Sequence, residues 1–535
     1  MKEQTIVIDV NKQYQTWDGF GTSLMWWANA IEGFEQIPAT TYGQEKGFEN
    51  RYQELMHLLF HPKEGLGINI VRYNVGGGDC GCLDFINRSG AKIPGYLNEN
   101  REYHWTADKM QQKVLKDAFR MIQSTDQHFY NTVFSVSPPY FMTYSGSSTG
   151  NKNAADDNLR WDCYEDFTDY FLNAASYIHD TLHIPVTDLE PVNEPTSGYW
   201  VYGSQKQEGC QFNRITQPEL HKNYFNPAKD SYNPDSCSAL NKIYEITGRE
   251  LARRQKMGKL DGVIISGTDE TSIDEALLSF QALTKKAKDY ISKIAVHGYM
   301  GSKRTELKEL AHTYQKELWM SEVSYGGGTW NPEAMDEGCF ALCRAIQKDI
   351  YELGVSGWVI WQAIEGLGEN LLWNSNWGLI HCLYEEPVWK ENNPFGMSRK
   401  QYDLGKEHSL TPEDIRKRGF SRGDYFLCKQ YNTFGQYTRF LREGFRIVDV
   451  SGSDLIAAVS LNGNLIVIAF NDSMQEKTYR IEVKNTGKII SVYETRTSET
   501  ERWANIDTPI YGDFWIVLHQ PARSVSTYEI VIQTI

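Results

Sequence analysis

The sequence lacks any apolar run long enough to cross a membrane, and its first residues, MKEQTIVIDV, lack the apolar core of a signal peptide. It also lacks an excess of positive charge, because 69 Asp and Glu outnumber 54 Lys and Arg and give a formal net charge of −15. A surface of that sign repels phosphates, so we expect neither nucleic acid nor a membrane as partner. As the chain is given, we expect a cytoplasmic protein, or a secreted or periplasmic one if a signal peptide was removed.

Cysteine is present, but not in patterns that bind metal. The chain has nine cysteines, an odd number, and neither the CGC at 80–82 nor the pair Cys339 and Cys343 has a second pair at zinc-site spacing. We therefore expect mostly reduced thiols, with a disulfide such as Cys210–Cys237 left open. Neither a metal nor a cofactor is expected.

Aromatic residues, by contrast, are plentiful, with 15 Trp and 31 Tyr. Most should pack in the core or on the surface, but a Trp excess also suits sugar binding, because pyranose C–H faces stack on indole rings. The 535 residues exceed one ordinary domain, so we expect one large domain and a smaller one.

Apolar strand patterns alternate with helical patterns through most of the chain. The expected strands are 17–23, 67–78, 131–141, 188–195, 262–270, 293–299, 317–323 and 357–366. Expected helices include 50–60, 106–124 with Thr106 as N-cap, 272–287 and 424–441. The strands are nearly continuous apolar runs, as in sheets buried on both faces. Eight alternating units predict an α/β fold, a (β/α)8 TIM barrel with its helices outside.

The pattern changes after residue 442 to an accessory all-β sandwich. DLIAAVS and NLIVIAF flank the turn signal Leu461-Asn462-Gly463, and further β-rich segments follow. The N-terminal strand is expected to join this sandwich, because the termini of a domain often lie close together. The expected organisation is residues 1–15 in the sandwich, 16–441 in the catalytic barrel and 442–535 in the rest of the sandwich.

Two of the expected strands end at a carboxylate. The fourth stops at Asn193, Glu194 and Pro195, and the seventh ends at Glu322 before a glycine run. In such a barrel the carboxyl ends of all strands meet at one face, around one cleft. Glycoside hydrolysis needs one carboxylic acid to protonate the leaving oxygen and one carboxylate to attack the anomeric carbon. In a retaining enzyme the two lie roughly 5–5.5 Å apart.

Other polar and aromatic side chains end the remaining strands. Arg72 could keep the nucleophile ionised, since a nearby cation lowers a carboxylate pKa, and Tyr299 could donate to the same group. Asn193 could bind a sugar 2-hydroxyl, and Trp361 could form a floor for the sugar. Glu194 has no obvious cation in the sequence. The remaining candidates for substrate binding are Asn74, Tyr140, Trp200 and His297, whereas Asp269 and Glu270 are interpreted as loop-capping groups.

The chain resembles glycoside hydrolase family 30, part of a clan of retaining barrel glycosidases. The matching segments include WDGFGTSLMWWA (17–28), RYNVGGGD (72–79), SVSPPYFMTYSGSSTGN (135–151), PVNEPTSGYW (191–200), VHGY (296–299), LWMSEVSYGG (318–327) and ARSVSTYEI (522–530). The resemblance implies a barrel flanked by a β-sandwich to which both termini contribute. It implies Glu194 as acid/base and Glu322 as nucleophile, with Arg72, Asn193, His297, Tyr299 and Trp361 around them. GTSLMWWA, GGGD and SPPYFMTYSG are most similar to the branch that contains endo-β-1,6-galactanases.

These observations predict a retaining β-glycoside hydrolase, endo-β-1,6-galactanase-like, that acts on an oligo- or polysaccharide. One alternative keeps the fold and mechanism but changes the substrate to β-1,6-glucan, a β-glucoside or xylan. Another is a non-catalytic carbohydrate-binding protein on the same scaffold, which the presence of both glutamates disfavours. The sequence leaves open the exact sugar and linkage, endo or exo action, and the oligomeric state.

Overall fold

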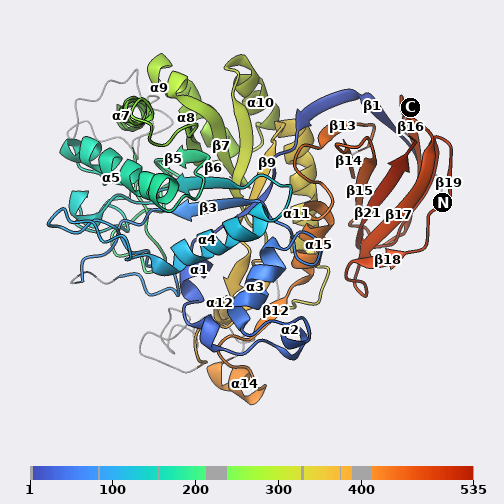
Figure 1. The fold of residues 1–535 in the computed structure, drawn as a ribbon, viewed down its shortest axis with the longest axis horizontal. Helices are drawn as coiled ribbons and strands as arrows, with labels where there is room; N and C mark the ends of the chain where they lie inside the picture. Colours follow the sequence, from blue (N-terminus) through green and yellow to red (C-terminus); the bar gives the residue numbers. More distant parts are fainter. Residues whose placement is uncertain are drawn as a thin grey trace.

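The computed structural model describes residues 4–81, 83, 85–154, 156–212, 238–326, 330–373, 375–387, 411–452 and 454–533. They form a closed eight-stranded parallel barrel beside a ten-stranded β-sheet domain, where both termini lie (Figure 1). The predicted fold class, a TIM barrel with an accessory all-β domain, is confirmed.

The barrel strands run in chain order around the barrel. They are β2 (Gly19–Ser23), β3 (Ile70–Asn74), β4 (Tyr130–Phe134), β5 (Asp188–Glu190), β6 (Ile264–Ser272), β7 (Ile291–Met300), β8 (Glu317–Val323) and β9 (Gly357–Gln362). The barrel closes where β2 pairs in parallel with β9, with Gly19 opposite Gly357. Several strands end earlier than predicted, because their last residues turn into the loops that build the cleft.

Helices surround the barrel (Figure 1). They are α1 (Trp27–Ala30), α2 (Thr41–Glu45), α3 (Arg51–Phe60), α4 (Lys109–Gln123), α5 (Tyr164–Ser176), α7 (Ser238–Gln255), α8 (Ile273–Ala282), α9 (Lys285–Tyr290), α10 (Arg304–Thr313), α11 (Glu337–Lys348), α12 (Leu367–Trp373), α14 (Pro412–Lys417) and α15 (Lys429–Thr438). A small sheet of β10 (Ile364–Gly366), β11 (Ile380–Cys382) and β12 (Tyr425–Leu427) lies among them.

Three helix predictions need correction. Thr106 is not the N-cap of α4: Asp108 holds that position, and its carboxylate accepts a hydrogen bond from the Tyr73 hydroxyl at 2.7 Å instead of capping the helix. The predicted helix 272–287 is divided into α8 and α9, because Leu283 is extended between them. The predicted helix 424–441 begins with strand β12, and only α15 is helical.

The accessory domain is one hydrogen-bonded sheet that encloses its own core. Its order is β18-β17-β21-β15-β14-β13-β1-β16-β20-β19, from β1 (Gln4–Thr16), β13 (Arg446–Val450), β14 (Leu455–Val459), β15 (Leu465–Asn471), β16 (Lys477–Lys484), β17 (Ile489–Thr497), β18 (Ala504–Ile506), β19 (Tyr511–Gly512), β20 (Trp515–Gln520) and β21 (Ser524–Ile532). Ile6, Val467 and Ile481 belong to that core. Gly463, with φ +84°, lies in the predicted turn between β14 and β15.

Among the described residues, no helix is both long and apolar enough to cross a membrane. Cys339 and Cys343 are free, buried thiols in α11. Cys82 and Cys237 lie outside the described residues, so the CGC pattern and the Cys210–Cys237 alternative fall there.

Candidate active site

The two predicted carboxyl groups lie at the carboxyl ends of β5 and β8. Glu322 is part of β8 itself, while Glu194 follows β5 in a turn. The backbone of Glu194 is left-handed, with φ +45°, and its N–H donates to the Asp269 carbonyl at 2.8 Å. A left-handed backbone is costly for a residue other than glycine and persists only where the surroundings hold it. The turn therefore fixes the direction of the Glu194 side chain.

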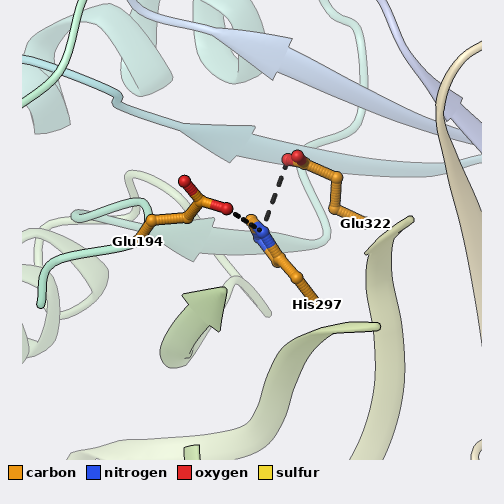
Figure 2. A group of neighbouring side chains, drawn as sticks. All are labelled: Glu194, His297 and Glu322. Carbon is orange, nitrogen blue, oxygen red and sulfur yellow. Dashed lines mark hydrogen bonds and ion pairs between the residues drawn. The ribbon is translucent and has the colours of Figure 1, made fainter. Parts of the chain in front are cut away.

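Glu194 and Glu322 face each other across His297 (Figure 2). Glu194 Oε1 is 3.0 Å from His297 Nδ1, and His297 Nε2 is 3.6 Å from Glu322 Oε2. One ligand atom from each of the three residues lies within 4.8 Å of the others. The two carboxyl groups are thus separated by a short gap with a buried imidazole beneath it.

Arg72 is the buried cation of the site. Its Nη1 donates to Glu322 Oε2 at 2.7 Å, and its Nη2 donates to Glu190 Oε2 and to Asp269 Oδ2, each at 2.9 Å. Arg72 was predicted to lie beside Glu322. Glu190 was not predicted as a member of the site, and Asp269 was interpreted as a loop-capping group. Asp269 is fully buried and also accepts from His297 Nε2 at 3.1 Å. Glu270 does hold a loop, since it accepts the Thr196 hydroxyl at 2.6 Å.

Burial and neighbouring charges shift the pKa of several groups in this cluster. Burial and the Asp269 carboxylate raise the pKa of Glu190 to about 8. Burial also raises the pKa of Glu322, although His297 and Arg72 oppose the rise. Burial alone would lower the pKa of His297, but the Glu322 and Asp269 carboxylates outweigh it and raise that pKa well above its ordinary value.

His297 is therefore a second cation, and it contacts Glu194. This differs from the expectation that Glu194 has no cation nearby. Sequence separation hides the contact, because His297 lies on β7 and reaches past β6 to the turn after β5. The described cluster pairs two cations, Arg72 and His297, with four carboxyl groups.

Tyr299 and Asn193 complete the surroundings of the pair. The Tyr299 hydroxyl donates to Glu322 Oε1 at 3.0 Å, opposite the oxygen that Arg72 binds. Asn193 Oδ1 accepts from Arg72 Nη2 at 3.3 Å. Both residues also line the cleft above the cluster. Each oxygen of Glu322 thus has its own donor, which orients the carboxylate.

The cleft above the cluster has a volume of about 1040 Å³, and both Glu194 and Glu322 line it. That volume lies at the upper end of the range for small-molecule sites. The predicted residues Trp200 and Trp361 line it. The Trp200 indole donates to the Glu194 carbonyl at 2.9 Å, and Trp361 meets the edge of Trp26 with ring centroids 5.2 Å apart. The cleft is lined by aromatic rings and has carboxyl groups at its base.

Four predicted binding residues do not line this cleft, and two of them, Arg72 and His297, belong to the buried cluster at its base. Asn74 is fully buried, where its side-chain oxygen accepts from the Val136 N–H at 3.2 Å. The Tyr140 hydroxyl donates to Glu99 Oε1 at 2.7 Å, on a short turn after β4. A strand-end position determines which end of the barrel a residue occupies, but not which way its side chain points.

Sequence reasoning also missed several residues of the cleft wall. These are Trp26, Arg88, Lys206, Glu365, Glu369 and Trp377. All lie in loops, or in short elements beside them, that carry no periodic pattern. The one available signal was the tryptophan pair after the first barrel strand, Trp26 and Trp27.

Distances alone would allow Glu194, His297 and Glu322 to hold a metal ion. The electrostatics argue for a different use. Both ring nitrogens of His297 face carboxylate oxygens, and its raised pKa favours the imidazolium, which has no lone pair to offer a metal. The arrangement fits the handling of protons better than the binding of a metal.

A parallel barrel with two buried carboxyl groups facing each other at the carboxyl ends of its strands has the architecture of a glycoside hydrolase. The family model described as O-Glycosyl hydrolase family 30 matches residues 3–223. The predicted resemblance to family 30 is confirmed.

Individual relatives extend the match. An exo-beta-1,6-galactobiohydrolase of Bifidobacterium longum subsp. longum is 25% identical over 94% of this chain, which spans 37% of that protein. An endo-beta-1,6-galactanase of Hypocrea rufa is 25% identical over 71% of this chain and 69% of its own length. The catalytic domain of GH30 xylanase C from Talaromyces cellulolyticus has the same fold, with a TM-score of 0.63, 16% identity, and coverage of 99% of this chain and 100% of its own.

Proposed function

We propose that this chain is a retaining β-glycosidase that cleaves β-1,6-linked galactan through a covalent glycosyl-enzyme. The observation that carries the proposal is the short gap between Glu194 and Glu322, whose facing atoms lie within 4.8 Å. Inverting enzymes separate their carboxyl groups by roughly 6.5–9.5 Å to seat a water molecule, whereas retaining enzymes use roughly 5–5.5 Å. The gap therefore favours direct attack by one of the two carboxylates.

Glu322 is the proposed nucleophile. Its two oxygens accept from Arg72 Nη1 at 2.7 Å and from the Tyr299 hydroxyl at 3.0 Å. These donors stabilise the carboxylate and oppose the effect of burial on its pKa. The ionised Glu322 attacks the anomeric carbon while the bond from that carbon to the leaving oxygen breaks, which forms a glycosyl ester.

Glu194 is the proposed acid and base. It gives its proton to the departing oxygen in the first step. In the second step its carboxylate takes a proton from water, the hydroxide oxygen bonds to the anomeric carbon, and Glu322 leaves as a carboxylate. Two displacements on opposite faces restore the original configuration.

His297 is the proposed positioning residue between the two glutamates. Its Nδ1 lies 3.0 Å from Glu194 Oε1, and its Nε2 is held by Asp269. At neutral pH Glu190 keeps its proton, because its pKa is about 8. The two cations then balance the charges of Asp269 and Glu322.

The choice of substrate rests on the two curated relatives, whose names specify β-1,6-linked galactose chemistry. The aromatic rings that line the cleft suit the apolar face of a galactose ring. β-1,6-Glucan, a β-glucoside and xylan are the competing substrates, and a non-catalytic sugar-binding role is the competing function.

Proton NMR of the hydrolysis of an aryl β-galactoside tests the mechanism. We expect the β-anomer of the sugar to form first, because two inversions give net retention. Appearance of the α-anomer first would overturn the proposal. A panel of β-1,6-galactan, β-1,6-glucan and xylan tests the substrate, and we expect the highest kcat/KM on galactan. No hydrolysis of any glycan or aryl glycoside would favour the binding protein.

A further inference from the structure

A row of buried polar side chains continues from the catalytic cluster toward the other end of the barrel. It consists of Glu190 and Asp188 on β5, Ser266 on β6 and Lys293 on β7, and none of them is more than 2% exposed. Residues two apart on a strand share a face, so Asp188 lies one layer below Glu190 on the same side of β5. Glu190 meets the cluster through Arg72, and Lys293 forms the far end of the row.

Ser266 lies between the two carboxyl groups of this row, but its hydroxyl has one hydrogen to donate. Its Oγ is 2.6 Å from Asp188 Oδ2 and 3.2 Å from Glu190 Oε1. Asp188 also forms an ion pair with Lys293 at 3.0 Å, so it carries charge and takes the hydrogen of the shorter contact. Two oxygens without a hydrogen between them repel. The contact with Glu190 is therefore favourable when Glu190 Oε1 carries a proton and donates it to Ser266 Oγ.

The other oxygen of Glu190 accepts from Arg72. Glu190 Oε2 lies 3.2 Å from Arg72 Nε and 2.9 Å from Nη2. The same guanidinium also donates to Asp269 and to Glu322. An ionised Glu190 would be a third anion on this one cation, whereas Glu190 with a proton on Oε1 keeps both bonds from Arg72 and adds no charge. A neutral Glu190 therefore leaves the field of Arg72 to the other two carboxylates.

Charged groups from four strands face Glu190. Burial raises its pKa most, and the Asp269 carboxylate of β6 raises it further. Arg72 of β3 opposes the rise, while the more weakly acting Asp188 of β5 raises the pKa and Lys293 of β7 lowers it. The resulting pKa of about 8 agrees with the position of the proton that the hydrogen bonds require.

We propose that Ser266 is a positioning residue that holds a proton on Glu190, so that the charge of Arg72 remains available to the nucleophile. Asp188, fixed by its ion pair with Lys293, orients the Ser266 hydroxyl for this task. These residues do not contact the substrate and act from inside the barrel. The inference rests on the proposed function, because a positioning role needs a reaction, but the place of the proton can be measured without turnover.

Infrared difference spectroscopy of the full chain tests where the proton lies. At a pH between the ordinary pKa of a glutamate and 8, the spectrum of the unaltered chain minus that of Glu190→Gln should contain the C=O stretching band of a protonated carboxylic acid. The band should shift in D2O and give way to carboxylate bands as the pH rises through about 8. Absence of the band would overturn the proposal, because Glu190 would then be ionised.

The acid limb of kcat/KM tests whether this proton matters to the reaction. Glutamine has the shape of a protonated glutamate, and its amide can donate to Ser266. Glu190→Gln should therefore leave the acid limb in place, whatever happens to the maximal rate. If Glu190 were ionised in the working enzyme, the substitution would delete a negative charge, lower the pKa of Glu322 and move the limb to lower pH. Such a displacement, a roughly tenfold gain in kcat/KM per pH unit on the acid side, would overturn the proposal.

Ser266→Ala removes the acceptor of the proton. The infrared band of Glu190 should then vanish at a lower pH than in the unaltered chain, and the acid limb should move to higher pH, because a charged Glu190 favours the proton on Glu322. Thr132→Val is the matched control. Thr132 is equally buried on β4 and donates to Asp188 Oδ1 at 3.1 Å, but it is paired across the strands with Asp188 and not with Glu190. The control should move neither the band nor the limb, and equal behaviour of the two variants would overturn the role of Ser266.

The outcomes separate this inference from the proposed function. If Ser266→Ala does not fold, the infrared titration and the acid limb of Glu190→Gln still decide. If the unaltered chain hydrolyses no glycoside, the proposed function fails, and the positioning role of Ser266 with it. A displaced limb in an active Glu190→Gln variant overturns the inference alone.

Discussion

Removing one hydroxyl, that of Tyr299, should move the acid limb of the pH–rate profile. The hydroxyl donates to Glu322 Oε1 at 3.0 Å, and Tyr299→Phe keeps the buried ring while deleting this donor. A hydrogen bond to a charged group contributes about 1.5–3 kcal/mol. Because about 1.4 kcal/mol corresponds to a factor of ten in an equilibrium constant, loss of the bond should raise the pKa of Glu322 and leave less of it ionised at acid pH.

The sign follows from which form reacts. Only the ionised Glu322 can attack, and the hydroxyl favours that form, so its loss moves the acid limb of kcat/KM to higher pH. On the acid side of the limb, kcat/KM should fall roughly 10- to 100-fold, and near the optimum the loss should be smaller. The limb belongs to the coupled pair of glutamates, so the alkaline limb is followed as well.

The assay is kcat/KM for an aryl β-galactoside across the pH range. Tyr130→Phe is the matched control, because the Tyr130 hydroxyl also faces a carboxylate, Glu443 Oε1 at 3.4 Å, at the other end of the barrel. Its profile should match that of the unaltered chain. If Tyr299→Phe is folded and its acid limb stays in place, the hydroxyl does not control the charge of Glu322, and the reasoning is refuted.

Three further predictions concern individual carboxyl groups. Glu322→Gln should fold and bind sugar but lose roughly two or more powers of ten in kcat, because no nucleophile remains; residual activity above a few per cent would contradict its role. Glu194→Ala should lose far more activity on galactan than on activated aryl glycosides and should be rescued by azide with a β-glycosyl azide as product; equal losses would contradict its role as acid. Glu190 has a raised pKa of about 8 in the folded chain, so its contribution to stability is present at low pH and declines as the pH rises from about 5 to 8, by up to about 1.4 kcal/mol per unit. Urea titrations should therefore show Glu190→Gln gaining stability relative to the unaltered chain over that range, and a constant difference would contradict the assignment.

The barrel could be predicted because its strands are buried on both faces and are therefore continuous apolar runs. Their ends could not be placed from that pattern. The segment 188–195 was predicted as one strand, yet β5 ends at Glu190, and the left-handed Glu194 lies in a turn beyond it. The backbone of Glu194 depends on a bond to the Asp269 carbonyl, a partner far along the chain.

The centre of the site was more predictable than its periphery. The residue types at Arg72, Glu194 and Glu322 are those that the chemistry needs, and a barrel brings strand ends together whatever their separation. The partners of these residues depend on side-chain direction and strand register, which explains why Glu190 was missed. Cleft-lining residues such as Arg88 lie in irregular loops, whose sequences have no hydrophobic periodicity from which their contacts could be predicted.

The position of β1 in the accessory sheet has a consequence for how the chain acquires its shape during synthesis. Ile8 pairs with both Val450 on β13 and Val483 on β16, so β1 is held by two strands that are made long after it. At 5–20 residues per second, roughly 20 to 90 s pass between synthesis of β1 and of β13. Throughout that interval β1 presents unpaired edges that other nascent chains could bind.

All strands of the barrel are synthesised before β13. Its first and last strands, β2 and β9, are both complete by Gln362, well before β13 is made. We therefore expect the barrel to assemble first. The accessory sheet should close last, when β13 and β16 can pair with β1. The accessory sheet therefore depends on β1 staying unpaired with other chains until β13 and β16 have been made.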